Sequence, residues 1–323
     1  MKRLSNALAL RAKRLRTAIA ALVIGVALAA VIGCASTAPG TLAPPSMPAA
    51  RAALLPEYRL FYDALDGYGD WPLVEPYGFV FRPRVDPVWW RPYYDGYWSP
   101  TDNYGWVWNS ADPFGWATDH YGRWLYDDFK GWVWVPGLDW APAWVEWTYG
   151  NDLIGWAPLP PGNTGAWSSR IPNGPYIYAP TSQLAHTDLK GRIRTAAEVG
   201  ERADNMQVVV NDALRDGVTV PLGPPIERIE RASGFPLQRA RIEELSAGAA
   251  PIAELRRAAE RVAQENRSLT GRDAQTPQRA AVLRPAALRD PPATGSVRPF
   301  EKRENPLRPG KRPAAPDSTR RPR

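Results

Sequence analysis

The chain has 323 residues, and its 40 Lys and Arg against 33 Asp and Glu give a net charge of +7. It contains 15 tryptophans, 35 prolines and 1 cysteine, which excludes a fold held by internal disulfides. Six positive charges lie in the first 33 residues, so a chain that loses this segment carries 7 − 6 = +1, and the basic composition does not indicate nucleic-acid binding.

The N-terminus predicts export and lipid attachment. After the basic stretch, an apolar run from Thr17 to Ile32 has the length of a secretory signal and is slightly short of a membrane span. It ends in Val31-Ile32-Gly33-Cys34, where branched residues and a small residue precede the cysteine. We expect a signal peptide over 1–33 and a membrane anchor on Cys34, which would carry diacylglycerol and palmitate. A retained signal anchor is the alternative.

The residues after the cysteine indicate destination and spacing. Ala35, rather than Asp, follows Cys34, and this resembles the signal for transfer to the outer membrane of Gram-negative bacteria. We therefore expect an exported protein, anchored in the outer membrane and facing the periplasm. Residues 34–56 are rich in Ala, Pro, Ser and Thr, which favours a flexible tether.

Composition then divides the chain near residue 167. All 15 tryptophans lie between Trp71 and Trp167, and we expect a domain over 57–167. Residues 71–167 carry 11 acids and 5 bases, net −6, whereas residues 168–323 carry 18 acids and 27 bases, net +9.

An internal repeat with an offset of 26 residues organises the tryptophan-rich region. Tyr104–Ser110 recurs as Lys130–Pro136, and Trp98 maps onto Trp124. A half-copy precedes them at Tyr77–Pro83, and a contracted copy follows at Ile154–Pro158.

Each unit reads as a β-hairpin. Tryptophans two residues apart share one face of a strand, with Val107 or Val133 opposite, and the connectors are rich in Pro, Asp, Asn and Gly. Trp98 is expected to meet Trp106 or Trp108 across the strands, and Trp124 to meet Trp132 or Trp134. We expect a mainly β fold, a small barrel or curved sheet of three or four related hairpins.

The ordered tryptophan string also indicates a family. Phe114–Trp124, Gly131–Gly137, Trp140–Val145 and Gly155–Pro161 together resemble the domain-of-unknown-function 6600 family of bacterial exported proteins. The resemblance covers roughly residues 70–165. It implies a compartment outside the cytoplasm, and the family has no established activity to transfer.

The remaining chain predicts a mixed extension and a tail. Residues 168–248 contain short apolar runs typical of strands, and a short helix is expected from Ile226 to Ala232. Apolar residues at helical spacing predict an amphipathic helix over 249–270, which either packs lightly on the domain or binds a partner. Residues 271–323 are rich in Arg and Pro, and we expect disorder there.

Residues with catalytic or metal-binding chemistry are few, so we expect neither an enzyme nor a metal or other cofactor. His120 and His186 lie far apart in sequence, and His120 is interpreted as a histidine of the sheet that is hydrogen-bonded to a loop. Most carboxylates occupy turn positions. Glu146 is the exception, because strand alternation places it beside Trp144, where it could accept a hydrogen bond from a sugar hydroxyl.

A binding role is the leading hypothesis, because a domain of this size cannot readily bury so many indoles. The candidate surface is Trp98, Trp106, Trp108, Trp124, Trp132, Trp134, Trp144 and Glu146. The expected partner is peptidoglycan, another envelope glycan or an envelope protein. The alternatives are a scaffold lipoprotein that docks other envelope proteins and, less favoured, a glycan-active hydrolase.

Overall fold

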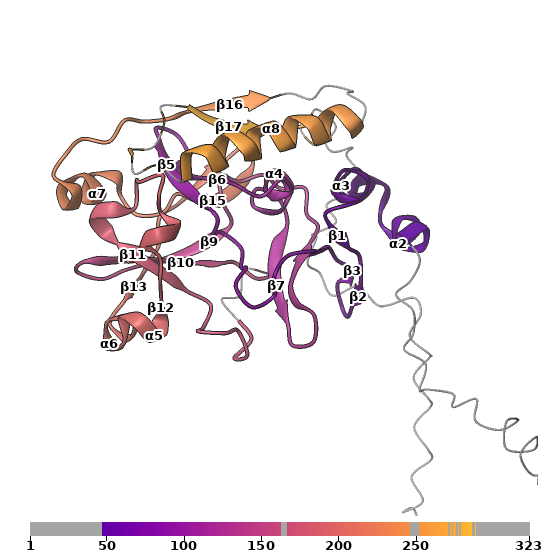
Figure 1. Ribbon diagram of the computed structural model, residues 1–323, viewed down its shortest axis with the longest axis horizontal. Helices are drawn as coiled ribbons and strands as arrows, with labels where there is room; N and C mark the ends of the chain where they lie inside the picture. Colours follow the sequence, from indigo (N-terminus) through magenta and orange to yellow (C-terminus); the bar gives the residue numbers. More distant parts are fainter. Residues whose placement is uncertain are drawn as a thin grey trace, which may run out of the picture. The chain divides into compact units, whose positions relative to one another are not determined.

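The computed structural model describes residues 47–162, 167–245, 252–270, 272, 274–275, 277, 279–285 and 288 (Figure 1). The expected signal peptide, Cys34 and residues 291–323 lie outside this range. No helix among the described residues is long and apolar enough to cross a membrane.

The described part of the chain begins with helices, where the sequence predicted a flexible tether. α2 (Met47–Ala53), the 3₁₀-helix η1 (Pro56–Tyr58) and α3 (Arg59–Leu65) follow one another. Ala50 and Leu54 are buried, and Phe61 packs edge-on against Trp134 at 5.1 Å. The tether prediction is therefore wrong from residue 47 onward. This alanine-rich segment forms helices, and their apolar face packs against the core.

Two small antiparallel pairs follow. β1 (Gly69–Asp70) pairs with β4 (Arg82–Pro83), and β2 (Leu73–Val74) pairs with β3 (Gly78–Phe79). Phe81, directly before β4, is joined to β8 (Gly131–Val135) by an isolated bridge, in which Phe81 and Trp134 exchange backbone hydrogen bonds of 2.9 and 2.7 Å.

The three predicted tryptophan hairpins are confirmed. They are β5 (Gly96–Thr101) with β6 (Gly105–Ser110), β7 (Arg123–Asp127) with β8 (Gly131–Val135), and β9 (Val145–Tyr149) with β10 (Leu153–Pro158). Trp98 lies opposite Trp108, and Trp124 lies opposite Trp134, as the repeat predicted. A short helix, α4 (Gly115–Thr118), joins the first two hairpins.

The hairpins do not close into a barrel within the described residues. The first two remain two-stranded, whereas the third lies in a five-stranded sheet of order β12-β11-β10-β9-β13. The added strands are β11 (Ile177–Pro180), β12 (Arg194–Thr195) and β13 (Gln207–Val209). The expected barrel is corrected to several small sheets packed through their side chains, because both faces of the hairpins are buried: Val107 and Val133, opposite the indoles, are also inaccessible.

The segment from 181 to 233 adds short elements: η2 (Thr181–Gln183), η3 (Lys190–Arg192), α5 (Ala196–Val199), α6 (Glu201–Asp204), the hairpin β14 (Asp212–Arg215) with β15 (Val218–Pro221), and α7 (Ile226–Ser233). α7 ends at Gly234 in the left-handed conformation, φ 81°, as the glycine signal predicted. Ile171, Ile177 and Leu184 share one buried cluster with Trp98, so the change of composition at 167 falls inside a continuous core.

The C-terminal helix is part of this core. α8 (Ile252–Thr270) connects β16 (Arg241–Leu245) to β17 (Arg279–Leu283), and the two strands pair in parallel, which requires a long crossover such as this helix (Figure 1). Ala280 and Val282 are buried. The predicted disordered tail is therefore wrong for 279–283, where a short apolar run lies between arginines.

Candidate functional site

The structure buries every tryptophan of the predicted binding surface. Each of the seven is at most 8% exposed: Trp98, Trp106, Trp108, Trp124, Trp132, Trp134 and Trp144. Trp98 shows the reason, because it meets Trp108 at 4.9 Å and Trp147 at 4.5 Å between ring centroids. The expected exposed indole stripe is corrected to an aromatic core, since further layers of the fold cover both faces of each hairpin.

Polar partners inside the protein confirm this core role. The indole N–H of Trp134 donates to the Tyr121 carbonyl at 2.7 Å, and that of Trp106 donates to the Pro224 carbonyl at 2.9 Å. A buried indole needs such an acceptor. These donors are therefore not available to an outside ligand.

Glu146 is only partly buried, and its carboxylate is already engaged. Its Oε1 accepts a hydrogen bond from the hydroxyl of Tyr176, whose ring lies 5.4 Å from that of Trp167. Burial and this carboxylate raise the pKa of Tyr176. A sugar hydroxyl would have to displace the tyrosine.

His120 is hydrogen-bonded to a loop, as predicted, but it lies in the turn after α4 and not in a sheet. It is buried, its Nδ1 lies 3.1 Å from the Ala141 carbonyl oxygen, and its ring stacks on Trp140. Burial lowers the pKa of His120 to about 4, so the imidazole is neutral at physiological pH. The described residues contain no group of three or more His, Cys, Asp or Glu that could hold a metal ion.

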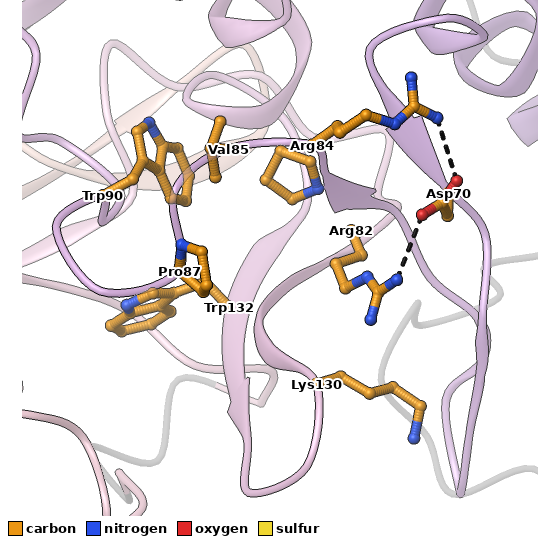
Figure 2. A pocket seen from close by; sticks show the side chains of 9 residues that line it. Asp70, Arg82, Arg84, Val85, Pro87, Trp90, Lys130 and Trp132 are labelled. Carbon is orange, nitrogen blue, oxygen red and sulfur yellow. Dashed lines mark hydrogen bonds and ion pairs between the residues drawn. The ribbon is translucent and has the colours of Figure 1, made fainter.

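The accessible candidate site is a pocket of about 200 Å³ (Figure 2). It forms where the Phe81–Trp134 bridge brings β4 and the loop after it against β8. Its lining combines cations, one carboxylate and apolar side chains: Asp70, Arg82, Pro83, Arg84, Val85, Pro87, Trp90, Lys130 and Trp132. We call it the basic pocket.

Two indoles, the partly buried Trp90 and Trp132, which is only 8% exposed, form the aromatic wall of the basic pocket, and both are fixed from behind. The Trp90 N–H donates to Asp112 at 3.0 Å, and the Trp90 ring meets Trp124 edge-on at 5.3 Å. Trp132 packs edge-on against Tyr126 at 5.4 Å. A wall held in this way keeps its shape before a ligand arrives, which lowers the entropic cost of binding.

The charged part of the basic pocket is held together by Asp70. Arg82 and Arg84 each place one Nη2 near a different Asp70 oxygen, at 3.2 and 3.1 Å. Burial alone would raise the pKa of Asp70, but the hydrogen bonds and charges of the two arginines outweigh it and hold that pKa below its usual value. Lys130 lies 3.8 Å from Asp127.

The lining therefore carries a surplus of positive charge in a region that is otherwise acidic. Three of the five basic residues between 71 and 167 line this one pocket. The other two serve the interior: Arg91 donates to the Gly174 and Pro175 carbonyls, and the Arg123 guanidinium lies 3.4 Å from the centre of the Trp144 ring.

Exposed apolar side chains adjoin the lining in sequence. Val88 and Trp89 are 70% and 77% exposed and lie between Pro87 and Trp90, and Phe129 is 91% exposed and precedes Lys130. Both loops are fixed, because the Asp86 and Asp127 side chains accept the backbone N–H of Val88 and Phe129 at 2.9 Å. Their exposure is thus a property of ordered turns.

Sequence reasoning placed Trp132 among the candidates but did not single out Arg82, Arg84 or Lys130. The available signal was the rarity of cations in this region and their position at the ends of the repeat copies, with Arg82-Pro83 ending one copy and Lys130-Gly131 opening another. The sequence alone did not predict the Phe81–Trp134 bridge, which joins these two copies of the repeat.

Residues 62–163 match the model of a family of unknown function, DUF6600. This confirms the resemblance that the tryptophan string indicated, and the matched region includes the three hairpins and the whole basic pocket. No curated protein and no solved structure matches the chain.

Proposed function

We propose that this DUF6600-like protein is a lipid-anchored envelope protein that binds a cell-envelope glycan, without catalysis, through the basic pocket. The observation that carries the proposal is the pairing of fixed indoles with cations in one accessible hollow. Indole faces suit stacking on sugar rings, and guanidinium groups recognise oxyanions and hydroxyls. The surrounding Trp89 and Phe129 offer further apolar contact.

The anchor is a separate part of this proposal. Lipid on Cys34 would hold the protein in the outer membrane, and the folded part would face the periplasm, within reach of the peptidoglycan. Labelling cells with radioactive palmitate tests it: the wild-type protein incorporates label and fractionates with outer membranes, and Cys34→Ser does neither. Equal labelling of both forms would exclude Cys34 as the anchor.

Co-sedimentation of the purified protein with peptidoglycan sacculi tests the binding function. Arg84→Gln and Trp89→Ala are the informative variants, because both side chains are largely exposed and their loss should leave the fold intact. Arg170→Gln is the matched control: its side chain is 67% exposed, against 64% for Arg84, and its ion pair with Asp128 lies outside the pocket lining.

We expect saturable binding by the wild type and the control, and weaker binding by both pocket variants. A version truncated after residue 290 keeps β17 and should bind as well as the full chain. Binding that the truncation abolishes and the pocket variants do not change would assign the interaction to the basic tail. Absence of binding by every form would refute peptidoglycan as the glycan.

A specific surface favours the second candidate function, a scaffold that docks envelope proteins. β13 is an edge strand of the five-stranded sheet, and Val208, Val210 and Leu214 on and beside it are exposed. The backbone of an edge strand can pair with a strand of another chain, and exposed apolar side chains can pack against it. Cross-linking through a cysteine placed at Val210, followed by mass spectrometry, distinguishes this function: one recurrent envelope partner supports it.

A further inference from the structure

We infer that the ligand of the basic pocket is an acidic sugar, in which one pyranose ring lies against the indole wall and its carboxylate or phosphate is held by the cations. This inference rests on the proposed function and names the class of glycan. It follows from the arrangement of charge, apolar surface and volume in one place.

The excess positive charge of the lining favours an anionic ligand. Arg82, Arg84 and Lys130 contribute three positive charges, whereas Asp70 in the lining and Asp127, which lies 3.8 Å from Lys130, contribute two negative ones, so the pocket carries a surplus of one. Asp70 stays ionised because its pKa is lowered by the arginines, so it balances one guanidinium and orients both. Each guanidinium has five N–H donors, and Asp70 takes one from each.

The apolar part of the lining favours a sugar ring attached to that anionic group. Figure 2 shows Trp90, Trp132 and Pro87 on one side of the pocket, and Arg82, Asp70 and Lys130 on the other. A free inorganic anion would leave the indole wall unused, and a neutral sugar would leave the excess positive charge uncompensated. An acidic sugar satisfies both sides at once.

The size of the pocket limits how much of the glycan it holds. Pockets for drug-sized ligands have volumes of roughly 300–1,000 Å³, and this one measures about 200 Å³. It therefore suits one sugar unit. The rest of a polymer would run outward, where the exposed Trp89 and Phe129 can contact its neighbouring units.

Titration calorimetry with matched sugars tests the inference on the purified full-length protein. N-Acetylmuramic acid is compared with N-acetylglucosamine, and glucuronic acid and glucose 6-phosphate are compared with glucose. Inorganic phosphate alone is the control for the anion. Indole N–H signals in NMR spectra, with Trp90 and Trp132 assigned by single Trp→Phe variants, report whether the ring reaches the wall.

We expect each acidic sugar to bind at least about tenfold more tightly than its neutral partner, the size expected of one charge-assisted hydrogen bond. Binding should weaken as salt rises. Arg84→Gln and Lys130→Gln should each weaken it by about tenfold or more. Arg170→Gln and Lys190→Gln should not change it, because their ion pairs with Asp128 and Asp95 lie outside the lining.

Several results would overturn the inference. Neutral sugars that bind as well as acidic ones would refute the role of the anion. Inorganic phosphate that binds as tightly, with no shift of the Trp90 or Trp132 signals, would refute the role of the ring. If the protein binds vesicles containing anionic lipid but none of the sugars, the surface is a membrane contact.

This outcome is separable from that of the sacculus experiment. Pocket-dependent binding to sacculi without preference for acidic sugars keeps the proposed function and rejects the acidic ligand. A preference for acidic sugars without binding to sacculi keeps the ligand class and rejects peptidoglycan as its source.

Discussion

The buried amide of Asn266 offers the sharpest test of how α8 belongs to the fold. Its Nδ2 donates to the Ser110 carbonyl at 2.9 Å, and its Oδ1 accepts the Tyr97 hydroxyl at 3.2 Å. All three residues are buried. Asn266→Ala removes both hydrogen bonds and leaves a buried hydroxyl and a buried carbonyl without these partners.

The expected cost follows from these contacts. Each of the two buried groups left without its partner costs about 1–3 kcal/mol, so Asn266→Ala should lower the free energy of unfolding by about 2–6 kcal/mol. Tyr97→Phe should cost about 1 kcal/mol, and a double-mutant cycle should give a coupling energy of about 1 kcal/mol.

Urea unfolding followed by circular dichroism measures these values. Gln264→Ala is the matched control, because Gln264 is exposed on the same helix, and it should change stability by less than about 0.5 kcal/mol. An Asn266→Ala protein as stable as the control, or a coupling energy of zero, would mean that α8 does not dock on the first hairpin in solution.

Three further predictions follow from positions with close packing or burial. Burial, aided by the charge of Asp112, raises the pKa of Asp119 from 3.8 to about 7, so the folded state holds a proton that the unfolded state has released, and stability falls as pH rises from about 4 to about 7. Asp119→Asn should therefore gain stability over the wild type between pH 4 and pH 8, by up to about 4 kcal/mol, and thermal melts that run parallel across this range would contradict the shift. Gly105→Ala should destabilise by several kcal/mol, of the order of other strained backbone changes, because a Cβ there would lie 1.9 Å from the Leu222 carbonyl oxygen at a φ of 65°; an unchanged melting temperature would count against this close approach. Val282→Asp should prevent stable folding, because the side chain is buried in β17; a soluble, cooperatively melting variant would show that β17 is dispensable.

The hairpins could be predicted because their information is local. Tryptophans at alternate positions and glycines at the turns define each strand pair, and the register that places Trp98 opposite Trp108 follows from the connector length. The burial of both faces could not be predicted in this way. The layers that cover them include α8 and β17, which follow the hairpins by more than 80 residues.

The site was less predictable than the fold. The excess of indoles suggests exposure, whereas the large aromatic core accommodates the candidate tryptophans and leaves Trp89 as the indole that faces solvent most. The basic pocket depends on one isolated bridge between Phe81 and Trp134, which has no periodic signature. The strand at 279–283 was missed because arginine and proline dominate the composition around it.

The long-range closure of the fold also has a consequence for biogenesis. The Arg256 guanidinium on α8 donates to the Ala64 carbonyl, 192 residues earlier. β16 has no strand partner until β17 has been synthesised. Contacts so distant along the chain form late and slowly. A nascent chain emerging from its N-terminus would hold exposed indoles until residue 283 has appeared, so we expect folding to finish only after synthesis and to depend on chaperones that shield aromatic segments.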